Sequence, residues 1–558
     1  MKRALLAIAV SAACLGAAPA AAAPLPNVVA DDLAPPLGGW RVTGARSVRA
    51  VSLRDGRGLR LAAPASIAHS LPRGPVALSL DLLPAPGSTA IVDLGASGLR
   101  LDTDANGAVT LRAPGLPATA LPAAGWATGG WRHLEITGGS TPKLAIDGQE
   151  LAADLKLTNA LGLRATKGSL QATGFLATRR DDRRAALLHR LAELHARVPF
   201  GRFPVGIGAV DGLLRFTRDW TDGFWPGMLW LAGDMTGPNA PFADWARAAT
   251  DRHRGREKDA IHDQGFRYLP SSAAAHDRDC RTAAARGSSY CTRLRQSAYT
   301  AADTLVKLAA GNEAVGTIPT FPAGGSCKRC ASADESETIV DSMMNLGILG
   351  WAWHERGSPQ YREVALRHAR ALEPLLVRAD GSTAQSVVAS RVDGHVIWTG
   401  TRQGYSDTST WARGQGWAVF GFADTGARFR DRALVAVAER AAAYVDGRLP
   451  ASGIPPYDYD APAPAPVDTS AGVITAAGAL RLAQACESLS GACKSSAARW
   501  RSLGQRMLGA SLGRVTRLPP IGMLGDQVYS LGGSSAWDDS GEYAFGLYYA
   551  LDAIRRSR

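Results

Sequence analysis

The stretch RRDDRRAALLHRLAELHARV, residues 179–198, marks the point at which the hydrophobic pattern of this chain changes. Its leucines at 187, 188, 191 and 194 recur at spacings of three and four residues, the pattern of an amphipathic helix. Similar stretches follow to the C-terminus, with no convincing series of strands between them. The pattern predicts helices near 182–197, 222–235, 240–254, 263–275, 293–310, 336–354, 359–375, 411–426, 430–446, 468–486, 494–510 and 540–554.

These twelve predicted helices favour six helical hairpins closed into a ring, an (α/α)6 toroid over residues 180–558. An all-α superhelix is the alternative, but no short sequence repeat supports a solenoid. The predicted fold class is therefore mainly α, with a different kind of domain before it.

Residues 24–178 contain short alternating segments such as VALSLDLLP and STAIVDLG, separated by turn signals such as Asp147-Gly148. Many short strands at close spacing are typical of a β-sandwich. The run GWRHLEITGGSTPKLAIDGQEL resembles one hairpin of the laminin-G and concanavalin-like sandwiches. This all-β domain has two possible roles, which the sequence leaves open: it binds carbohydrate, or it packs against the toroid.

Residues 1–23 predict a signal peptide, since Lys2 and Arg3 precede a short apolar run and an alanine-rich cleavage region. The expected location is periplasmic or secreted. An uncleaved membrane anchor is the alternative, and a lipoprotein at Cys14 is another. We expect no contact with a membrane once the signal is cleaved.

The formal net charge of +12 falls to +10 when Lys2 and Arg3 are removed. A basic surface favours polyanions. For an exported protein, acidic polysaccharide is a better partner than nucleic acid, which we do not expect it to bind. The alternative is a compositional bias, because arginine greatly outnumbers lysine.

Six cysteines remain after the signal, and they fall into three local pairs. In an oxidising compartment, proximity favours disulfides at 280–291, 327–330 and 486–493. A zinc site at the CKRC motif is the rival interpretation, although no histidine stands at a ligand spacing beside it.

Several segments combine aromatic, glycine and charged residues where a helix is expected to begin. They are DWTDGFWPGMLW (219–230), HDQGF (262–266), ETIVDSMMN (337–345), QGYSDTSTWARGQGW (403–417), PPYDYDAP (455–462), DTSAG (468–472) and DDSGEY (538–543). In this order they resemble the unsaturated glucuronyl hydrolases of glycoside hydrolase family 88, over roughly residues 200–555. The resemblance implies an (α/α)6 fold and cleavage of a terminal Δ4,5-unsaturated uronic acid from an acidic oligosaccharide.

The implied reaction is hydration of a vinyl ether, which needs one carboxyl group to donate a proton and then accept one from water. It implies no metal, cofactor or covalent nucleophile. Asp341 matches the family's general acid/base, and its apolar neighbours would raise its pKa. Asp263 matches the second aspartate, which would bind sugar hydroxyls and hold the pKa of Asp341 up. The structural alternative for both aspartates is helix capping.

The resemblance also implies substrate-binding residues. Arg413 and Trp417 lie four residues apart on one helix face and match a carboxylate-binding arginine and a stacking tryptophan. Trp225 is a candidate sugar platform, Trp411 a weaker one, and His262 a candidate supporting group. Packing is the alternative for the aromatic residues. Further candidates at the rim are Tyr457, Asp458, Asp468, Ser470 and Tyr543.

One position departs from the family pattern. In GSTAQSV (381–387), Gln385 stands where family members usually carry a histidine, and glutamine does not titrate near neutral pH. His395 is a possible compensating residue, with a structural role as the alternative.

Three other functions remain open at this level. The chain could be an unsaturated rhamnogalacturonyl hydrolase of the same fold, a non-catalytic protein that binds acidic glycans, or an adhesive surface protein.

Overall fold

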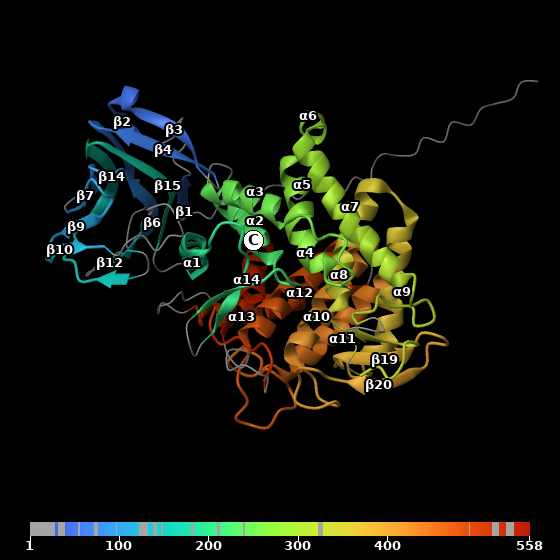
Figure 1. Ribbon diagram of the computed structural model, residues 1–558. Helices are drawn as coiled ribbons and strands as arrows, with labels where there is room; N and C mark the ends of the chain where they lie inside the picture. Colours follow the sequence, from blue (N-terminus) through green and yellow to red (C-terminus); the bar gives the residue numbers. More distant parts are fainter. Residues whose placement is uncertain are drawn as a thin grey trace, which may run out of the picture.

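The computed structural model describes residues 28–558, except 32–39, 54–55, 72–75, 96, 122–131, 138–141, 147–148, 180–182, 209–212, 238–239, 322–326, 328, 490–491, 516–523 and 532–540. A β-sandwich is followed by a ring of helices (Figure 1). The predicted signal peptide lies outside the described residues. Among the helices that are described, none has the length and apolarity required to span a membrane.

The sandwich consists of two antiparallel sheets. The first has the order β13-β12-β11-β6-β15-β4-β3, with β1 paired to β15, and the second has the order β10-β9-β8-β7-β14-β5-β2. The strands are β1 (Val28–Asp31), β2 (Arg41–Thr43), β3 (Val48–Leu53), β4 (Gly56–Ala62), β5 (Ala65–Ser70), β6 (Val76–Pro84), β7 (Thr89–Gly95), β8 (Gly98–Thr103), β9 (Val109–Ala113), β10 (Leu116–Ala120), β11 (Arg132–Thr137), β12 (Lys143–Ile146), β13 (Gln149–Leu151), β14 (Leu157–Lys167) and β15 (Ser169–Arg179).

The core of the sandwich follows from alternation along each strand. In β8, Leu99 and Leu101 are buried between the sheets, whereas Arg100 is exposed. Leu78, Leu80 and Leu82 of β6 are likewise buried between the sheets. The alternating segments of residues 24–178 thus form the predicted all-β domain.

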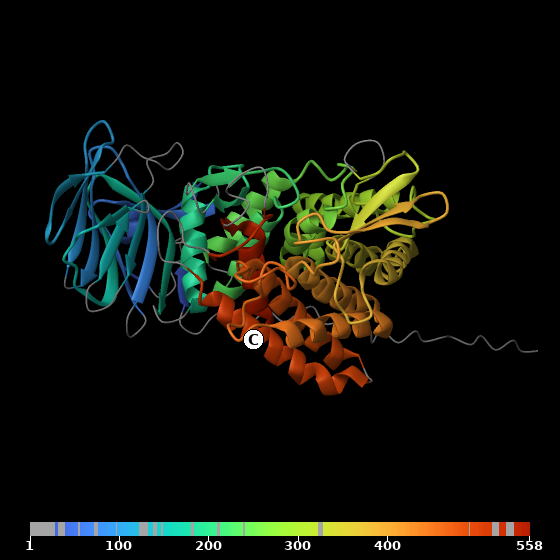
Figure 2. The same ribbon diagram turned by 90° about the horizontal axis from the view of Figure 1, so that it is seen from below.

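The helical ring has an inner and an outer layer. The described helices are α1 (Arg183–Arg197), α2 (Phe224–Thr236), α3 (Pro241–His253), α4 (Gln264–Tyr268), α5 (Ala274–Asp279), α6 (Ala283–Arg286), α7 (Ser289–Ala309), α8 (Ser342–Arg356), α9 (Pro359–Leu376), α10 (Ala412–Phe429), α11 (Arg432–Arg448), α12 (Thr469–Ser488), α13 (Ala497–Leu512) and α14 (Ala544–Arg556). Helix α2, α4 with the turn Leu269–Ala273 that follows it, α8, α10, α12 and α14 contact one another in that order, and α14 returns to α2. This closure confirms the (α/α)6 toroid, and Figure 2 shows the sandwich beside it, with α1 between.

Small residues allow the inner helices to approach closely. A Cβ added at Gly478 of α12 would lie 2.8 Å from the backbone of Phe420 on α10, and one at Gly421 would lie 2.5 Å from Met343 on α8. The inner helices are buried nearly all round, whereas outer helices such as α7 and α9 are buried along one stripe.

Two local expectations were wrong. The helix expected over 263–275 is interrupted after α4 by a π-helical turn, Leu269–Ala273, because Pro270 has no N–H to donate. Short sheets also stand between the helices. They comprise β16 (Pro204–Gly208), β17 (Leu214–Phe216) and β21 (Gly541–Tyr543), and β18 (Glu335–Ile339), β19 (Ser386–Ser390) and β20 (Val396–Gly400).

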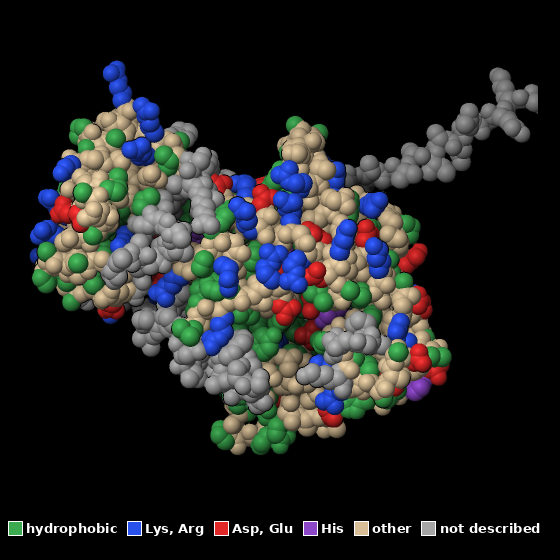
Figure 3. Space-filling view, in the orientation of Figure 1, with side chains coloured by type: hydrophobic (Ala, Val, Ile, Leu, Met, Phe, Trp, Pro, Cys, Tyr) green, Lys and Arg blue, Asp and Glu red, His purple; other side chains and the backbone are tan. Residues whose placement is uncertain are grey.

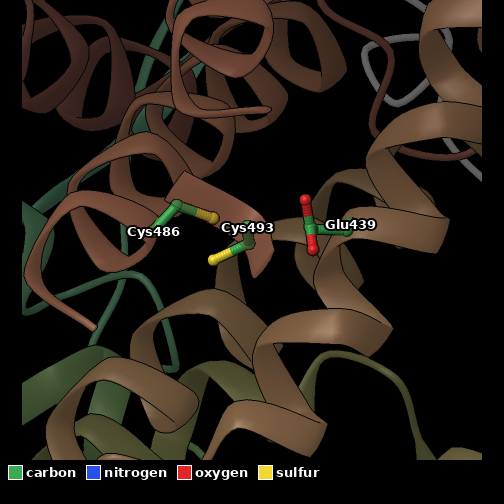
Figure 4. Close-up of side chains that lie close together, drawn as sticks. All are labelled: Glu439, Cys486 and Cys493. Carbon is green, nitrogen blue, oxygen red and sulfur yellow. The ribbon is translucent and has the colours of Figure 1, made fainter. Parts of the chain in front are cut away.

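The cysteine pairs follow the prediction in two cases. The sulfur atoms of Cys280 and Cys291, and those of Cys327 and Cys330, lie at bonding distance. Cys486 and Cys493 are instead free thiols, so the expected third bond is not formed. Cys486 is buried in the last turn of α12 and Cys493 lies in the following short helix, and the carboxylate of Glu439 lies beside both sulfurs (Figure 4).

Candidate active site

Asp341 stands directly before α8, where β18 ends. Its backbone occupies the N-cap position, yet its side chain makes no capping hydrogen bond. Within the described part of the chain, its buried Oδ2 has no hydrogen-bond partner. Its neighbours Val340 and Met343 are fully buried. The capping alternative is therefore wrong for Asp341, and its carboxyl group is free to act on a ligand.

The electrostatic surroundings of Asp341 come from three other predicted residues. Burial raises the pKa of Asp341 to about 6, Arg413 and His262 oppose the rise, and the neighbouring Asp263 carboxylate contributes to it. The structure thus brings Asp341, Asp263, His262 and Arg413 together. A carboxyl group with this pKa is suited to donating a proton near neutral pH.

Asp263 precedes α4 and is also not a helix cap, since its side chain makes no capping hydrogen bond. Its Oδ1 lies 3.1 Å from Nε2 of His262, and its side chain is 18% exposed. His262 is buried, with Nδ1 3.4 Å from Oγ1 of Thr320. The start of α4 is fixed against α8 because the backbone N–H of Phe266 donates to Oδ1 of Asn345, at 2.8 Å.

Arg413 is buried in the first turn of α10. Its two Nη atoms donate to the backbone carbonyls of Val528 and Tyr529, and its guanidinium lies 4.5 Å from the Trp411 ring centre. Nη1 also lies 3.6 Å from Oδ2 of Asp468. The guanidinium is thus a fixed positive charge near Asp341, with much of its donor capacity taken up by protein oxygens.

Gln385 organises the turn at residues 401–403. Its Oε1 accepts hydrogen bonds from Oγ1 of Thr401 at 2.7 Å and from the backbone N–H groups of Arg402 and Gln403 at 2.7 and 2.9 Å. Its Nε2 donates to Oε1 of Gln403, whose Nε2 donates to the carbonyl of Tyr529. The backbone carbonyl of Gln385 accepts the N–H of Val340, next to Asp341. The residue therefore positions the walls of the site.

The structure places two predicted sugar platforms in the core. Trp417 is fully buried against Phe266 and Tyr549, and Trp225 is 3% exposed and faces His195. Neither ring presents a face on which a sugar could stack in this structure, because both lie on the inner helices. Trp411 is also buried, and its ring supports Arg413.

The rim candidates are mostly structural. Asp458 is buried and accepts hydrogen bonds from the Tyr405 N–H and the Ser409 hydroxyl, close to the buried Tyr457. Asp468 caps α12 by accepting the N–H of Ser470. Tyr543 is buried in β21 and stacks on Phe545.

His395, the possible compensating residue, lies at the surface of the structure. It lies between β19 and β20, its side chain is 63% exposed, and its Nδ1 lies 2.7 Å from Asp393.

Three further residues belong to the site. Trp220 is partly exposed, and its Nε1 donates to the hydroxyl of Tyr529 at 3.0 Å. Tyr529 also binds Arg413 and Gln403 through its carbonyl. Trp220 and Gln403 stand in motifs that the sequence singles out, whereas Tyr529 has no helical or strand pattern around it. Figure 3 shows acidic and histidine side chains gathered near the centre of the face that carries these loops.

Potential metal ligands are grouped elsewhere. Among the described residues, Glu439, Cys486 and Cys493 place their ligand atoms within 4.8 Å of one another (Figure 4), as do the buried His276 and the exposed Asp277 and Glu355. Oε1 of Glu439 already accepts the Ser496 hydroxyl and the Trp500 indole N–H. Neither group contains an aspartate of the candidate active site.

No protein-family model matches the chain. Among characterised proteins, it is 33% identical over 289 residues to the unsaturated glucuronyl hydrolase of Bacillus sp. (strain GL1), a match that covers 50% of this chain and 72% of the relative. It is 30% identical over 244 residues to the unsaturated chondroitin disaccharide hydrolase of Streptococcus pneumoniae (strain ATCC BAA-255 / R6), covering 43% of this chain and 57% of the relative.

The solved structure of the unsaturated glucuronyl hydrolase from Bacillus sp. GL1 aligns with a TM-score of 0.56 at 28% identity. It covers 66% of this chain and 94% of that chain, so part of the present protein has no counterpart in that structure. The sequence match covers 72% of the Bacillus protein, and the ring of helices aligns with its solved structure. The chain belongs to the unsaturated glucuronyl hydrolase family.

Proposed function

We propose that the protein releases the terminal Δ4,5-unsaturated uronic acid from acidic oligosaccharides by hydrating the ring double bond. The observation that carries this proposal is the carboxyl group of Asp341. It is partly buried, its Oδ2 accepts no hydrogen bond from the described residues, and its pKa is raised to about 6. Membership of the family supports the same chemistry.

The reaction begins when Asp341 donates its proton to C4 of the vinyl ether, which leaves positive charge shared by C5 and the ring oxygen. Water adds to C5 and gives up its proton to the Asp341 carboxylate. The hemiketal formed at C5 opens, the glycosidic bond breaks, and the remaining sugar leaves with a free hydroxyl group. One water molecule is consumed, and Asp341 regains its proton.

The neighbouring residues have distinct proposed roles. Asp263, held by His262, binds sugar hydroxyls and contributes to the raised pKa of Asp341. Arg413 attracts the uronate carboxylate chiefly through its charge, because both Nη atoms already donate to backbone carbonyls. Trp220, whose side chain is partly exposed, takes the place of Trp225 as the proposed sugar platform.

The test compares Asp341→Asn with a matched control, Asp431→Asn. Asp431 precedes α11 and caps it, and it follows the end of α10 that is opposite to Arg413. Asparagine is also a good cap. With an unsaturated uronyl disaccharide as substrate, we expect Asp341→Asn to lower kcat by on the order of a hundredfold or more, and the control to keep its rate. Loss of ultraviolet absorbance by the double bond measures turnover.

The substrate supplies a second arm of the test. The saturated counterpart of the disaccharide has no vinyl ether to protonate, so it should be inert. Comparable hydrolysis of the saturated sugar would contradict the hydration mechanism and favour a scheme with two carboxyl groups across the glycosidic bond.

We further propose that the protein acts after export to the periplasm or the medium, with oxidised cysteine pairs at 280–291 and 327–330. The basic, apolar and alanine-rich order of residues 1–23 and the sulfur positions of both pairs support this. Thiol titration of denatured, unreduced protein should find Cys486 and Cys493 free and the other four blocked. Sequencing the N-terminus of the exported protein tests signal cleavage.

A further inference from the structure

The outer face of the second sandwich sheet carries a row of arginines. In the strand register, Arg112 of β9 lies opposite Arg100 of β8, and Arg100 lies opposite Ile91 of β7. Ile91 in turn lies opposite Arg164 of β14. Paired residues of neighbouring antiparallel strands point to the same side of a sheet. All three arginines are exposed, and the side chains of Arg100 and Arg112 keep 55% and 59% of their accessible surface.

The row is oriented by one acidic residue. The carboxylate of Asp102 accepts a hydrogen bond from Nε of Arg100 at 2.9 Å and another from Nε of Arg112 at 3.3 Å. Both bonds use Nε, and neither uses a terminal Nη atom of the two guanidinium groups. Lys167 and Arg41 are further exposed basic residues on strands of the same sheet. Figure 3 shows basic side chains along this outer edge of the sandwich.

The outer face of the first sheet, by contrast, is covered where β6 and β11 cross it. His133 of β11 and Asp81 of β6 pair across their strands and are 3% and 2% exposed. Helix α1 lies over them, with Arg190 3.6 Å from Glu135. Docking on the toroid therefore uses one sheet and leaves the arginine row of the other sheet facing solvent.

We propose that this arginine row binds the acidic polysaccharide from which the substrates of the toroid are produced. The choice of an acidic sugar polymer rests on the proposed function. Neighbouring strands lie about 4.8 Å apart, so Arg100 and Arg164 stand roughly 10 Å from each other, a spacing that suits charges repeated along an extended chain. The row contains Ile91 but no aromatic platform, so charge rather than stacking drives this binding.

The experiment measures binding separately from turnover. The full-length protein carrying Arg100→Ser, Arg112→Ser and Arg164→Ser is compared with a control carrying Arg49→Ser, Lys143→Ser and Lys156→Ser. The control removes the same number of exposed positive charges from the sandwich but leaves the row intact. Native affinity electrophoresis in gels that contain chondroitin sulfate, or neutral dextran, gives the apparent Kd for each.

Chondroitin sulfate should retard the unmodified protein and the control, and dextran should retard neither. The row variant should bind chondroitin sulfate about tenfold more weakly, and binding should weaken as salt is raised. Its kcat/KM on the unsaturated disaccharide should equal that of the unmodified protein. Retardation of the row variant equal to that of the unmodified protein, or equal losses in row variant and control, would overturn the proposal. A protein that binds the polymer but does not cleave the disaccharide would contradict only the proposed activity.

Discussion

At the scale of single residues, Asp341 determines how the rate should depend on pH. Its carboxyl group must be protonated to start the reaction, and its pKa is raised to about 6. We therefore expect kcat/KM to fall as the pH rises through about 6, following one ionisation in the free enzyme. Initial rates between pH 4 and 9 measure this. A rate that stays constant from pH 5 to pH 8 would mean that another group donates the proton.

Ionisation of Asp341 should lower the stability of the folded protein. Because the pKa is higher in the folded than in the unfolded state, folded protein binds more protons between about pH 4 and pH 6, and this contribution to stability is lost as the pH rises. Asp341→Asn should therefore raise Tm at pH 8, with the gain shrinking toward pH 4.

Asp431→Asn should change Tm at pH 8 in the opposite direction. Burial works against ionisation of Asp431, but Arg370 and two backbone N–H groups lower its pKa. The ionised form of Asp431 therefore stabilises the fold at neutral pH, and its replacement should lower Tm at pH 8. Equal Tm shifts of the same sign in both variants would contradict the proposed surroundings of Asp341.

Gln385 should affect both stability and turnover, because its side chain holds the turn at residues 401–403. In Gln385→Ala, the Thr401 hydroxyl and the N–H groups of residues 402 and 403 lose their common acceptor. We expect about 1–3 kcal/mol of lost stability, together with a lower kcat. Gln484→Ala on α12, where the side chain accepts a single bond of 3.3 Å from Arg556, is the control. A variant of Gln385 with unchanged kcat and Tm would exclude a positioning role.

The sequence motifs identified the acidic centre, but the structure buries Trp225, one of the predicted sugar platforms, in the core. Asp341, Asp263, His262 and Arg413 are brought together as predicted, because each stands at or next to the start of an inner helix. Within DWTDGFW, however, α2 begins only at Phe224, which places Trp225 in the core and leaves Trp220 in the preceding turn. The assignment of a tryptophan to core or pocket depends on where the helix starts, and boundaries are the least predictable feature of a helix.

At the scale of elements, the spacing between α4 and α8 fixes the two aspartates relative to each other. A Cβ at Gly265 would lie 2.3 Å from Cα of Asn345, so the two helices can touch only with glycine there. Gly265→Ala should push α4 from α8, lower Tm, and reduce kcat because Asp263 moves relative to Asp341. Gly447→Ala on α11, where an added Cβ meets nothing within 4 Å, should keep activity and slightly raise Tm. Full activity of Gly265→Ala would show that the two aspartates tolerate a change of spacing.

The outer helices were predictable because their apolar residues recur with helical period. The sheet of β18, β19 and β20 was not, although it carries Gln385 to the site. Its strands are only five residues long, and β19 is buried throughout, so no alternation of polar and apolar residues marks it.

At the scale of the whole molecule, the sandwich is attached through a buried polar cluster. Glu135 of β11 and Glu193 of α1 both face Arg190, at 3.6 and 2.7 Å. Burial opposes charge on His133, but Asp81 beside it raises its pKa. The sequence could not reveal this contact, because alternating polar residues on a strand usually indicate a solvent-exposed face. The polar outer positions of β6 and β11 are covered here by α1, the helix that follows the last strand of the sheet.

Arg190→Ala therefore tests whether sandwich and toroid behave as one cooperative unit. The substitution removes the positive charge that Glu135 faces and one of the two arginine partners of Glu193, which keeps Arg197 at 3.0 Å, and it should destabilise the contact by about 3 kcal/mol. Differential scanning calorimetry should show one transition for the unmodified protein, and for the variant a lower Tm with a separate, earlier melting of the sandwich. Arg184→Ala is the matched control, since Arg184 is an exposed arginine of the same helix. Turnover of an unsaturated disaccharide by the Arg190 variant should persist below the first transition, because no residue of the cluster belongs to the candidate active site. An unchanged single transition would show that apolar packing, rather than this cluster, joins the two parts.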